Sequence, residues 1–214
     1  MKKKHIVLDF DGTIFDSNRV ILASWQEVYR YYTGKEMDEA TIYRTFGETL
    51  RYSLSKAFPE ADPDEAVRIY REFQEAHYQE MTGLFDGVQE MMDQLRSTGH
   101  TLSIATSRVK ATTLEYLEML GLSNYFDALV TCDDTDKHKP DPTPLLMVLD
   151  KLGARREDSI MLGDTKFDIG CCNNAGVDSI LVGWSHAIDE ADMAAMGFRP
   201  TYRVKTPSEV LELV

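Results

Sequence analysis

The chain has 214 residues, 43% apolar and 28% charged, which is typical of a soluble globular protein with one large domain or a core carrying a smaller insert. Its net charge of −13 argues against nucleic acid as the main partner, because phosphate contacts need clustered Lys and Arg. The longest apolar runs fall well short of the ~20 residues that span a bilayer, so no membrane partner is expected.

The first predicted element is a short buried strand that ends in two acids. The apolar residues 6–8 lead into Asp9 and Asp11, which would share one side of the strand if it continued straight. Two like charges that close are costly to desolvate unless a cation or a shared proton lies between them. A plain hairpin turn at Asp11-Gly12 is the alternative interpretation.

The next stretch, residues 15–83, shows helical patterns without strand signals. A first helix is expected over about 17–32, and a second, short one begins near Asp38. A third begins at a cap on Asp62, with proline at its first position, and runs towards Gly83. These residues therefore form a helical block.

From residue 85 onward, helices and strands alternate regularly. Strands are expected at 101–105, 128–132, 159–162 and 179–182, and helices at 87–97, up to 120, at 142–153, at 168–175 and from a capping box at 206–209. This alternation predicts an α/β fold with right-handed βαβ units and a parallel sheet covered on both faces. Because the first strand belongs to that sheet, the helical block is an insertion after it.

Reactive side chains collect where the predicted strands end. The four ends carry Asp9 with Asp11, Thr106 with Ser107, Lys139 in the following loop, and Asp164 with Asp168 four residues later. Ligands bind beyond the carboxyl ends of the strands in an open parallel sheet. Alone, Lys139 reads as a solvated loop lysine and Asp164 as a helix cap. All four on one edge indicate a site.

The chemistry of this set fits phosphoryl transfer. Oxygen ligands from Asp9, Asp164 and a backbone carbonyl suit octahedral Mg²⁺. Lys139, the hydroxyl of Thr106 and nearby backbone N–H groups offer positive charge and donors to phosphoryl oxygens. A carboxylate can act as nucleophile and form an aspartyl-phosphate, while Asp11 can protonate the leaving oxygen and then activate water.

Four segments together resemble the motifs of the haloacid dehalogenase-like (HAD) phosphohydrolase superfamily. They are residues 9–13 (Asp-Phe-Asp-Gly-Thr), Thr106, Lys139-Pro140 and residues 163–168 (Gly-Asp-Thr-Lys-Phe-Asp). Within the superfamily the chain is most similar to the phosphoglycolate phosphatase group and the related bacterial pyrophosphatases. The resemblance implies a Rossmann-like core, residues 1–14 and 84–214, with an all-helical cap, residues 15–83, inserted after the first strand.

The resemblance also implies a role for each motif residue. Asp9 is the nucleophile, Asp11 the general acid and base, and Thr106 and Lys139 hold the phosphoryl group. The implied Mg²⁺ group is Asp9, Asp11 through its carbonyl, Asp164, and Asp168 as a ligand or as a partner of the ligands. The expected activity is Mg²⁺-dependent hydrolysis of a small phosphorylated metabolite, phosphoglycolate-like, with inorganic pyrophosphate or a nucleotide as alternatives.

Five further positions are expected to contact substrate: Gly12, Thr13, Gly47, Ser107 and Arg108. Gly47 falls where related caps present a specificity loop, although a helix stop is an equal interpretation. Arg108 would contact either the substrate or an acidic residue of the cap. Arg44 and Arg51 could meet a substrate carboxylate, but arginines on an exposed helix are usually only solvated.

Departures from the family pattern narrow the subclass. Asp11 argues against dehalogenase activity, since true dehalogenases lack this second aspartate. Residues 18–21 lack the cap histidine of hexose-phosphate mutases, so a sugar-phosphate mutase is less expected. A non-catalytic binding module is least expected, because no motif residue is missing.

Cysteine usage and the start of the chain bear on location. Cys132, Cys171 and Cys172 cannot all pair internally and show no zinc spacing, so a reducing compartment fits best. The apolar stretch behind the first lysines stops at Leu8, too short for the roughly 7–15 residues of a signal-peptide core. We therefore expect a cytoplasmic protein, a monomer or a homodimer.

Overall fold

A six-stranded parallel sheet forms the centre of the protein, which we describe over residues 3–185 and 190–214 of a computed structural model. The strand order is β5-β4-β1-β6-β7-β8, so the first strand lies in the middle. The strands are β1 (His5–Leu8), β4 (Thr101–Ala105), β5 (Ala128–Val130), β6 (Ser159–Gly163), β7 (Asp178–Val182) and β8 (Tyr202–Val204). The predicted α/β class with a Rossmann-like parallel sheet is confirmed.

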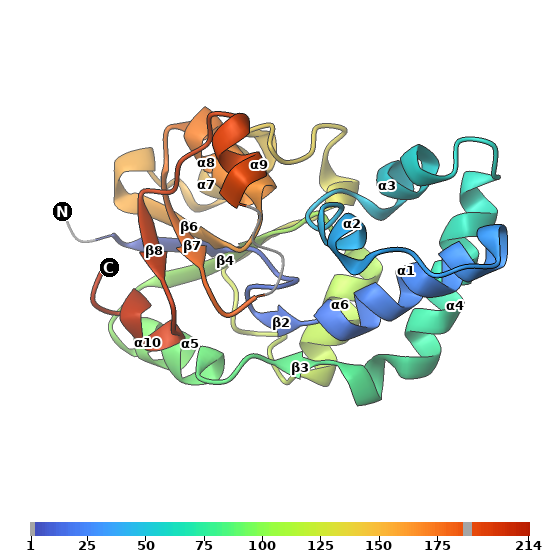
Figure 1. The fold of residues 1–214 in the computed structure, drawn as a ribbon. Coiled ribbons are helices and arrows are strands. Elements are labelled where there is room, and N and C mark those ends of the chain that lie inside the picture. Colours follow the sequence, from blue (N-terminus) through green and yellow to red (C-terminus); the bar gives the residue numbers. More distant parts are fainter. Residues whose placement is uncertain (1–2, 186–189) are drawn as a thin grey trace.

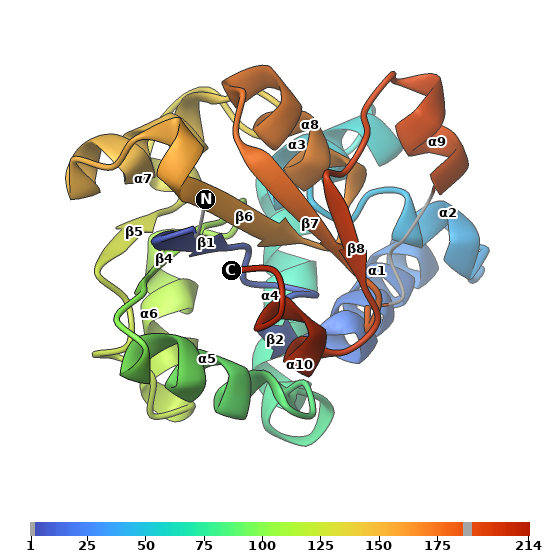
Figure 2. The same cartoon turned by 90° about the vertical axis from the view of Figure 1, so that its left-hand side faces the viewer.

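Helices cover both faces of this sheet (Figure 2). They are α5 (Val88–Ser97), α6 (Lys110–Met119), α7 (Thr143–Leu152), α8 (Lys166–Ala175), α9 (Glu190–Ala195) and α10 (Pro207–Val210), with short 3₁₀ turns at Cys132–Asp134 and Arg156–Asp158. Alternation along β1 explains the layering: Ile6 and Leu8 pack with α5, α6 and α10, whereas Val7 packs with α7 and α8. Because both faces are buried, the strands read as continuous apolar runs.

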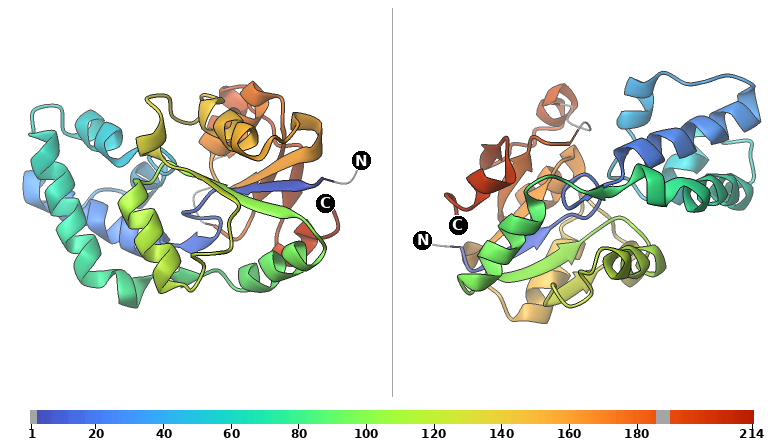
Figure 3. Two further views of the ribbon diagram at one scale, coloured as in Figure 1. Left: turned by 180° about the vertical axis from the view of Figure 1, so that it is seen from behind. Right: turned by 90° about the horizontal axis from the view of Figure 1, so that it is seen from below.

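Four of the five helices between β1 and β4 form a separate body beyond one end of the sheet (Figures 1 and 3). These are α1 (Asn18–Thr33), α2 (Glu39–Tyr43), α3 (Leu50–Ala57) and α4 (Pro63–Met81), hereafter the helical segment. They enclose a core of their own, in which Trp25 of α1, Leu54 of α3 and Tyr70 of α4 are buried together. The segment thus has an apolar centre independent of the sheet.

The expectation of helices alone over residues 15–83 was wrong at both ends of that stretch. Two short strands, β2 (Phe15–Asp16) and β3 (Gly83–Leu84), pair antiparallel and join the helical segment to the sheet. Each strand has two residues, too few for a period-2 pattern to show in the sequence. Because β2 and β3 pair, the chain leaves the core and returns to it at the same place.

Several smaller expectations also differ from the structure. Helices α3 and α9 and the edge strand β8 were not predicted, and the strand expected at 128–132 ends at Val130 because a 3₁₀ turn begins at Cys132. The capping box at Thr206 is absent: Glu209 accepts a hydrogen bond from the backbone N–H of Lys205 instead. Over residues 3–185 and 190–214, none of the helices is both long and apolar enough to cross a membrane.

Candidate active site

The carboxyl edge of the sheet gathers the predicted motif residues. Asp9 directly follows β1, Thr106 follows β4 and Asp164 follows β6. Backbone hydrogen bonds extend the ladder past the strand ends, from Asp9 N to Leu162 O at 2.9 Å and from Thr106 N to Val130 O at 3.0 Å. The edge is therefore held rigidly by the sheet itself.

Lys139 reaches this edge from the loop before α7 and is fully buried. Its Nζ lies 2.9 Å from Asp9 Oδ1 and 2.5 Å from Asp168 Oδ1, and it donates to Ala105 O at 3.2 Å. Burial alone would lower the pKa of Lys139, but the two carboxylates raise it above its ordinary value. The ammonium is therefore a permanent positive charge beneath the two acids.

Three buried acids surround one point at the end of the sheet. Asp9, Asp164 and Asp168 each offer a carboxylate oxygen, and these oxygens lie within 4.8 Å of one another. Both oxygens of Asp168 are occupied, one by Lys139 and the other by the backbone N–H and hydroxyl of Thr165 at 3.0 and 2.5 Å. Asp164 Oδ2 accepts from Ser185 at 2.6 Å, whereas Asp164 Oδ1 is buried without a hydrogen-bond partner among the described residues.

The acid cluster carries more negative charge than its single lysine balances. Burial, together with the charge of Asp168, raises the pKa of Asp9 to about 7 despite Lys139. Burial and the charges of Asp168 and Asp9 likewise raise the pKa of Asp164 well above its ordinary value. A divalent cation would relieve this repulsion and satisfy the orphaned oxygen of Asp164, so these residues fit a hard metal ion.

Gly12 allows the first motif to lie against the fourth. Its φ is +77°, and a Cβ atom placed on it would lie 2.1 Å from Asp164 Oδ2. Only glycine combines this left-handed backbone with so close an approach. Gly12 and Thr13 thus form the turn behind Asp11, outside the residues that line the cavity described below.

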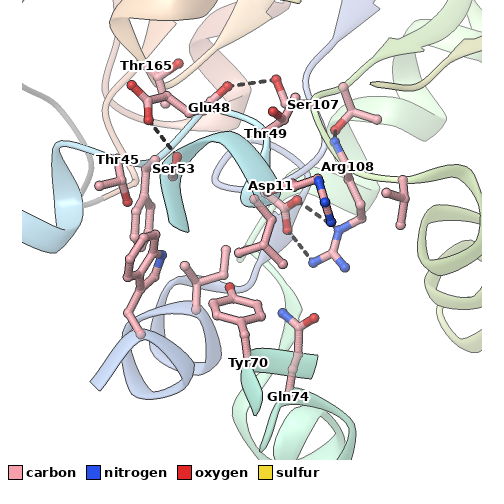
Figure 4. Close-up of a pocket in the computed structure, with 18 of the residues that line it drawn as sticks. Asp11, Thr45, Glu48, Thr49, Ser53, Tyr70, Gln74, Ser107, Arg108 and Thr165 are labelled. Atoms are coloured by element: carbon pink, nitrogen blue, oxygen red, sulfur yellow. Dashed lines mark hydrogen bonds and ion pairs between the residues drawn. The ribbon is translucent and has the colours of Figure 1, made fainter. Parts of the chain in front are cut away.

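Asp11 points away from the acid cluster, because β1 ends at Leu8 and the chain turns at once between Phe10 and Phe15. Arg108 donates two hydrogen bonds to the Asp11 carboxylate, from Nε to Oδ2 and from Nη2 to Oδ1, both at 2.9 Å (Figure 4). The Ser17 hydroxyl donates to Oδ1 at 2.5 Å. The strand does not continue straight to Asp11, so the condition under which the two acids would share one side of it is not met.

The environment of Asp11 keeps it ionised. About a quarter of its side chain (26%) is exposed, whereas Arg108 is almost completely buried at 4%. Burial would raise the pKa of Asp11, but the charge and hydrogen bonds of Arg108 and the bond from Ser17 hold it below its usual value. The guanidinium of Arg108 is centred 4.5 Å from the ring of Tyr116, which fixes its plane.

A cavity of about 420 Å³ lies between the sheet edge and the helical segment. Its floor includes Asp9, Asp11, Thr106, Ser107, Arg108 and Asp164, and its walls include Trp25, Gly47, Glu48, Tyr70, Arg71 and Gln74. Figure 4 shows Tyr70 and Gln74 on one side and Ser107 and Arg108 on the other. Lys139 and Asp168 lie beneath this floor rather than in the lining.

The loop around Gly47 contacts the sheet edge directly. Ser107 Oγ donates to Gly47 O at 2.7 Å, and a Cβ atom on Gly47, whose φ is +89°, would lie 2.7 Å from Thr165 Oγ1. The helical segment therefore touches two motif loops of the core. Arg51, at the exposed margin of the cavity, is ion-paired to Asp64.

Sequence reasoning overlooked the residues that support the motif acids. Ser17 looked like a helix cap, but its hydroxyl bonds Asp11 and makes no cap hydrogen bond. Two other supporting residues lie in segments without any motif. Ser185 donates a hydrogen bond to Asp164, and Tyr116 stacks on Arg108. Their roles depend on contacts between distant parts of the chain, so no local pattern could indicate them.

We expect the metal-free protein to lose stability as the pH rises. Asp9 titrates near pH 4 in the unfolded chain but at about 7 in the folded protein, so the folded state binds more protons between these values and ionisation at higher pH destabilises it. Thermal unfolding with a chelator at pH 5 and pH 7.5 measures this effect. Asp164→Asn removes one repelling charge, so its unfolding temperature should change less between pH 5 and pH 7.5 than that of wild type. An equal change in the variant and in wild type would contradict the prediction.

A parallel α/β sheet with a buried acid cluster and a lysine at its carboxyl edge defines a Rossmann-like enzyme fold with a polar site at that edge. Comparison with known families agrees: residues 6–182 match the model of the haloacid dehalogenase-like hydrolase family. The chain belongs to this family. It is an enzyme, a HAD-like phosphatase, as the sequence resemblance implied.

Individual relatives match the chain along nearly all of its length. "Pyrophosphatase PpaX" of Halalkalibacterium halodurans is 32% identical over 218 residues, covering 100% of this chain and 98% of the relative. The protein of the same name from Bacillus velezensis is 28% identical over 208 residues, 97% of this chain and 94% of the relative. These values extend the similarity beyond the motifs to the helical segment.

Solved structures agree on the fold. A protein from Lactobacillus plantarum, described provisionally as a phosphoglycolate phosphatase, superposes with a TM-score of 0.84 at 26% identity over 100% of both chains. A haloacid dehalogenase-like hydrolase from Bacteroides fragilis gives a TM-score of 0.84 at 25% identity, over 98% of this chain and 100% of that one.

Proposed function

We propose that the protein is a Mg²⁺-dependent phosphatase of a small phosphorylated metabolite and works through an aspartyl-phosphate on Asp9. The observation that carries the proposal is the cluster of Asp9, Asp164 and Asp168 over Lys139, with one oxygen of Asp164 unpartnered. Asp9 and Asp164 face a cavity large enough for a small ester and closed on one side by the helical segment.

The metal would be held by Asp9, Asp164 and the backbone carbonyl of Asp11, with Asp168 anchoring Lys139 beside them. When bound, Mg²⁺ supplies charge that draws a phosphoryl oxygen to the site and offsets negative charge in the transition state. Because Asp168 already uses both oxygens, we propose that it acts through Lys139 and Thr165 rather than as a direct ligand.

In the first step a carboxylate oxygen of Asp9 attacks phosphorus, and the bond from phosphorus to the leaving oxygen breaks. Lys139 favours the charged, nucleophilic form of Asp9 by direct ion pairing. The hydroxyl of Thr106 accepts from Arg108 N at 3.1 Å, so its own proton remains available for a phosphoryl oxygen. Ser107 lies at the same edge, but its hydroxyl proton is already donated to Gly47 O.

In the second step water attacks phosphorus, and Asp9 leaves as a carboxylate. Asp11 accepts the proton of that water, a role suited to a carboxylate that Arg108 and Ser17 hold ionised. For the first step, Asp11 must instead take up a proton before passing it to the leaving oxygen. The Arg108 pair thus favours Asp11 as a base over Asp11 as an acid.

We propose phosphoglycolate-like esters as substrates, with inorganic pyrophosphate as the second candidate. Full-length relatives described as pyrophosphatases, at 32% and 28% identity, favour that second candidate. Residues 15–83 would act as a cap over the site, supported by the bond between Ser107 and Gly47. Free Cys132, Cys171 and Cys172 support a cytoplasmic setting, in which the protein would act as a monomer or homodimer.

A phosphate-release assay over a panel tests the proposed activity. The panel is phosphoglycolate, pyrophosphate, p-nitrophenyl phosphate, a nucleoside monophosphate and a hexose phosphate, each with Mg²⁺ and with EDTA. We expect turnover of at least one compound in Mg²⁺ and none in EDTA. Lack of phosphate release from every compound, or release that EDTA leaves unchanged, would overturn the proposal.

In the variant Asp11→Asn, hydrolysis of the aspartyl-phosphate should become the rate-limiting step. p-Nitrophenolate leaves without protonation, so phosphorylation of Asp9 should continue while loss of the base slows hydrolysis by about 10²–10⁴-fold. Stopped-flow absorbance should then show a burst of about one equivalent of nitrophenolate, followed by slow turnover. Steady turnover at the wild-type rate would exclude the base role of Asp11.

A further inference from the structure

Three arginines line the cavity, and they differ in their partners. The Arg51 side chain is 60% exposed and ion-paired to Asp64 on the surface. Arg108 is bound to Asp11 through two of its nitrogens, while its third, Nη1, is buried without a hydrogen-bond acceptor among the described residues. Arg71, from α4 of the helical segment, has no carboxylate partner in the described part of the chain.

Arg71 is the unusual member of the set. It is partly buried, and its Nη1 donates to the neutral side chain of Gln74, with Oε1 at 2.7 Å. The ring centroid of Tyr70 lies 5.9 Å from its guanidinium carbon. Burial lowers the pKa of Arg71, and the neighbouring charge of Arg108 lowers it further. Two guanidinium groups therefore influence each other here, and Arg108, not Arg71, is the one paired with the Asp11 carboxylate.

A partly buried charge without a paired counter-ion is less stable than a solvated or paired one, so an arrangement of this kind indicates a missing anion. The planar guanidinium matches a carboxylate or a phosphoryl group, both of which can accept two parallel hydrogen bonds. Arg71 is on the wall side of the cavity, whereas Asp9 and Asp164 form part of its floor. The two ends of the cavity thus have opposite charge requirements.

We propose that Arg71, with Arg108 beside it, binds a second anionic group of the substrate, either a carboxylate or a second phosphoryl group. The proposal rests on the phosphatase function given above, which places the scissile phosphoryl group at the floor. The cavity of about 420 Å³ restricts the substrate to a small molecule in which the two groups lie near each other. Esters with neutral tails would leave Arg71 without a counter-ion and react less efficiently.

The test compares variants of two arginines on α4. Arg71→Gln removes the charge and Arg71→Lys keeps it, while Arg68→Gln is the matched control, because Arg68 is exposed and pairs with Glu72 on the outside. Each variant is assayed with phosphoglycolate and pyrophosphate, which carry a second anion, and with ethyl phosphate and p-nitrophenyl phosphate, which have neutral tails.

We expect Arg71→Gln to lower kcat/KM by roughly 10- to 100-fold for whichever second-anion substrate the enzyme uses, but by less than about 3-fold for the neutral esters. Arg71→Lys should recover part of the loss, and Arg68→Gln should match wild type. If the loss is confined to phosphoglycolate, the group that Arg71 binds is a carboxylate. If it is confined to pyrophosphate, the group is a second phosphoryl group. Equal losses on both classes of substrate, or no loss on either, would overturn the proposal.

Inhibition of the wild type gives a second measurement that needs no variant. Phosphonoacetate and methylenediphosphonate mimic the two second-anion substrates, and ethylphosphonate is their neutral-tailed counterpart. At least one of the first two should inhibit p-nitrophenyl phosphate turnover at a Ki about 10-fold below that of ethylphosphonate; equal Ki values would contradict the inference. If the wild type hydrolyses none of the esters, the phosphatase proposal itself fails, which is a separate result.

Discussion

Asp9→Asn should abolish turnover while leaving the protein folded. The amide keeps the size of the side chain but is too weak a nucleophile to attack phosphorus, so kcat should fall by more than about 10³-fold. The substitution also removes one charge from a cluster in which burial and like charges raise the pKa of Asp9 to about 7. Metal-free Asp9→Asn should therefore unfold at a temperature no lower than wild type.

The pairing of lost activity with retained stability makes this prediction specific. Asp86→Asn is the matched control, because Asp86 is an exposed acid in the loop before α5. It should match wild type in both p-nitrophenyl phosphate turnover and thermal unfolding. If the kcat of Asp9→Asn were within about tenfold of the wild-type kcat, Asp9 would not be the nucleophile.

Lys139→Met should damage both activity and stability. Lys139 is the one cation in ion-pair contact with Asp9 and Asp168 in the described part of the chain, and its removal leaves several buried carboxylates uncompensated. Removing one partner of a buried pair costs about 3–5 kcal/mol. The free energy of unfolding in chelator at pH 7.5 should fall by that amount, and turnover should become undetectable.

The pH dependence of this loss separates charge from packing. At pH 5 Asp9 is mainly protonated, so the variant should be destabilised less than at pH 7.5. Lys137→Met, an exposed position in the same loop, serves as the control and should behave as wild type. Equal destabilisation at both pH values would mean that Lys139 acts by filling space rather than by its charge.

The sheet and the convergence of its motifs were predictable because each depends on local signals. The apolar strand before Asp9 and the strand before Asp164 are short runs bounded by turn residues. The rule that ligands bind at the carboxyl ends of parallel strands then places these acids at one edge. No pairing of distant residues had to be known to reach that result.

The partners of the motif residues were not predictable in the same way. The turn between Phe10 and Phe15 directs Asp11 to Arg108 instead of to Asp9, and this depends on the pairing of β2 with β3, two residues each. Arg71 is one of the two arginines among the charged residues of α4. Only the three-dimensional structure shows that it faces the cavity while Arg68 faces outward with its acidic partner.

Mapping the phosphorylated residue tests the account most directly. The enzyme is mixed with Mg²⁺ and substrate, quenched in acid within one turnover, and treated with borohydride, which reduces an acyl phosphate of aspartate to homoserine. Mass spectrometry of the peptides should find the modification at Asp9, absent in Asp9→Asn. Modification at another residue, or none while phosphate is being released, would contradict an aspartyl-phosphate at the end of β1.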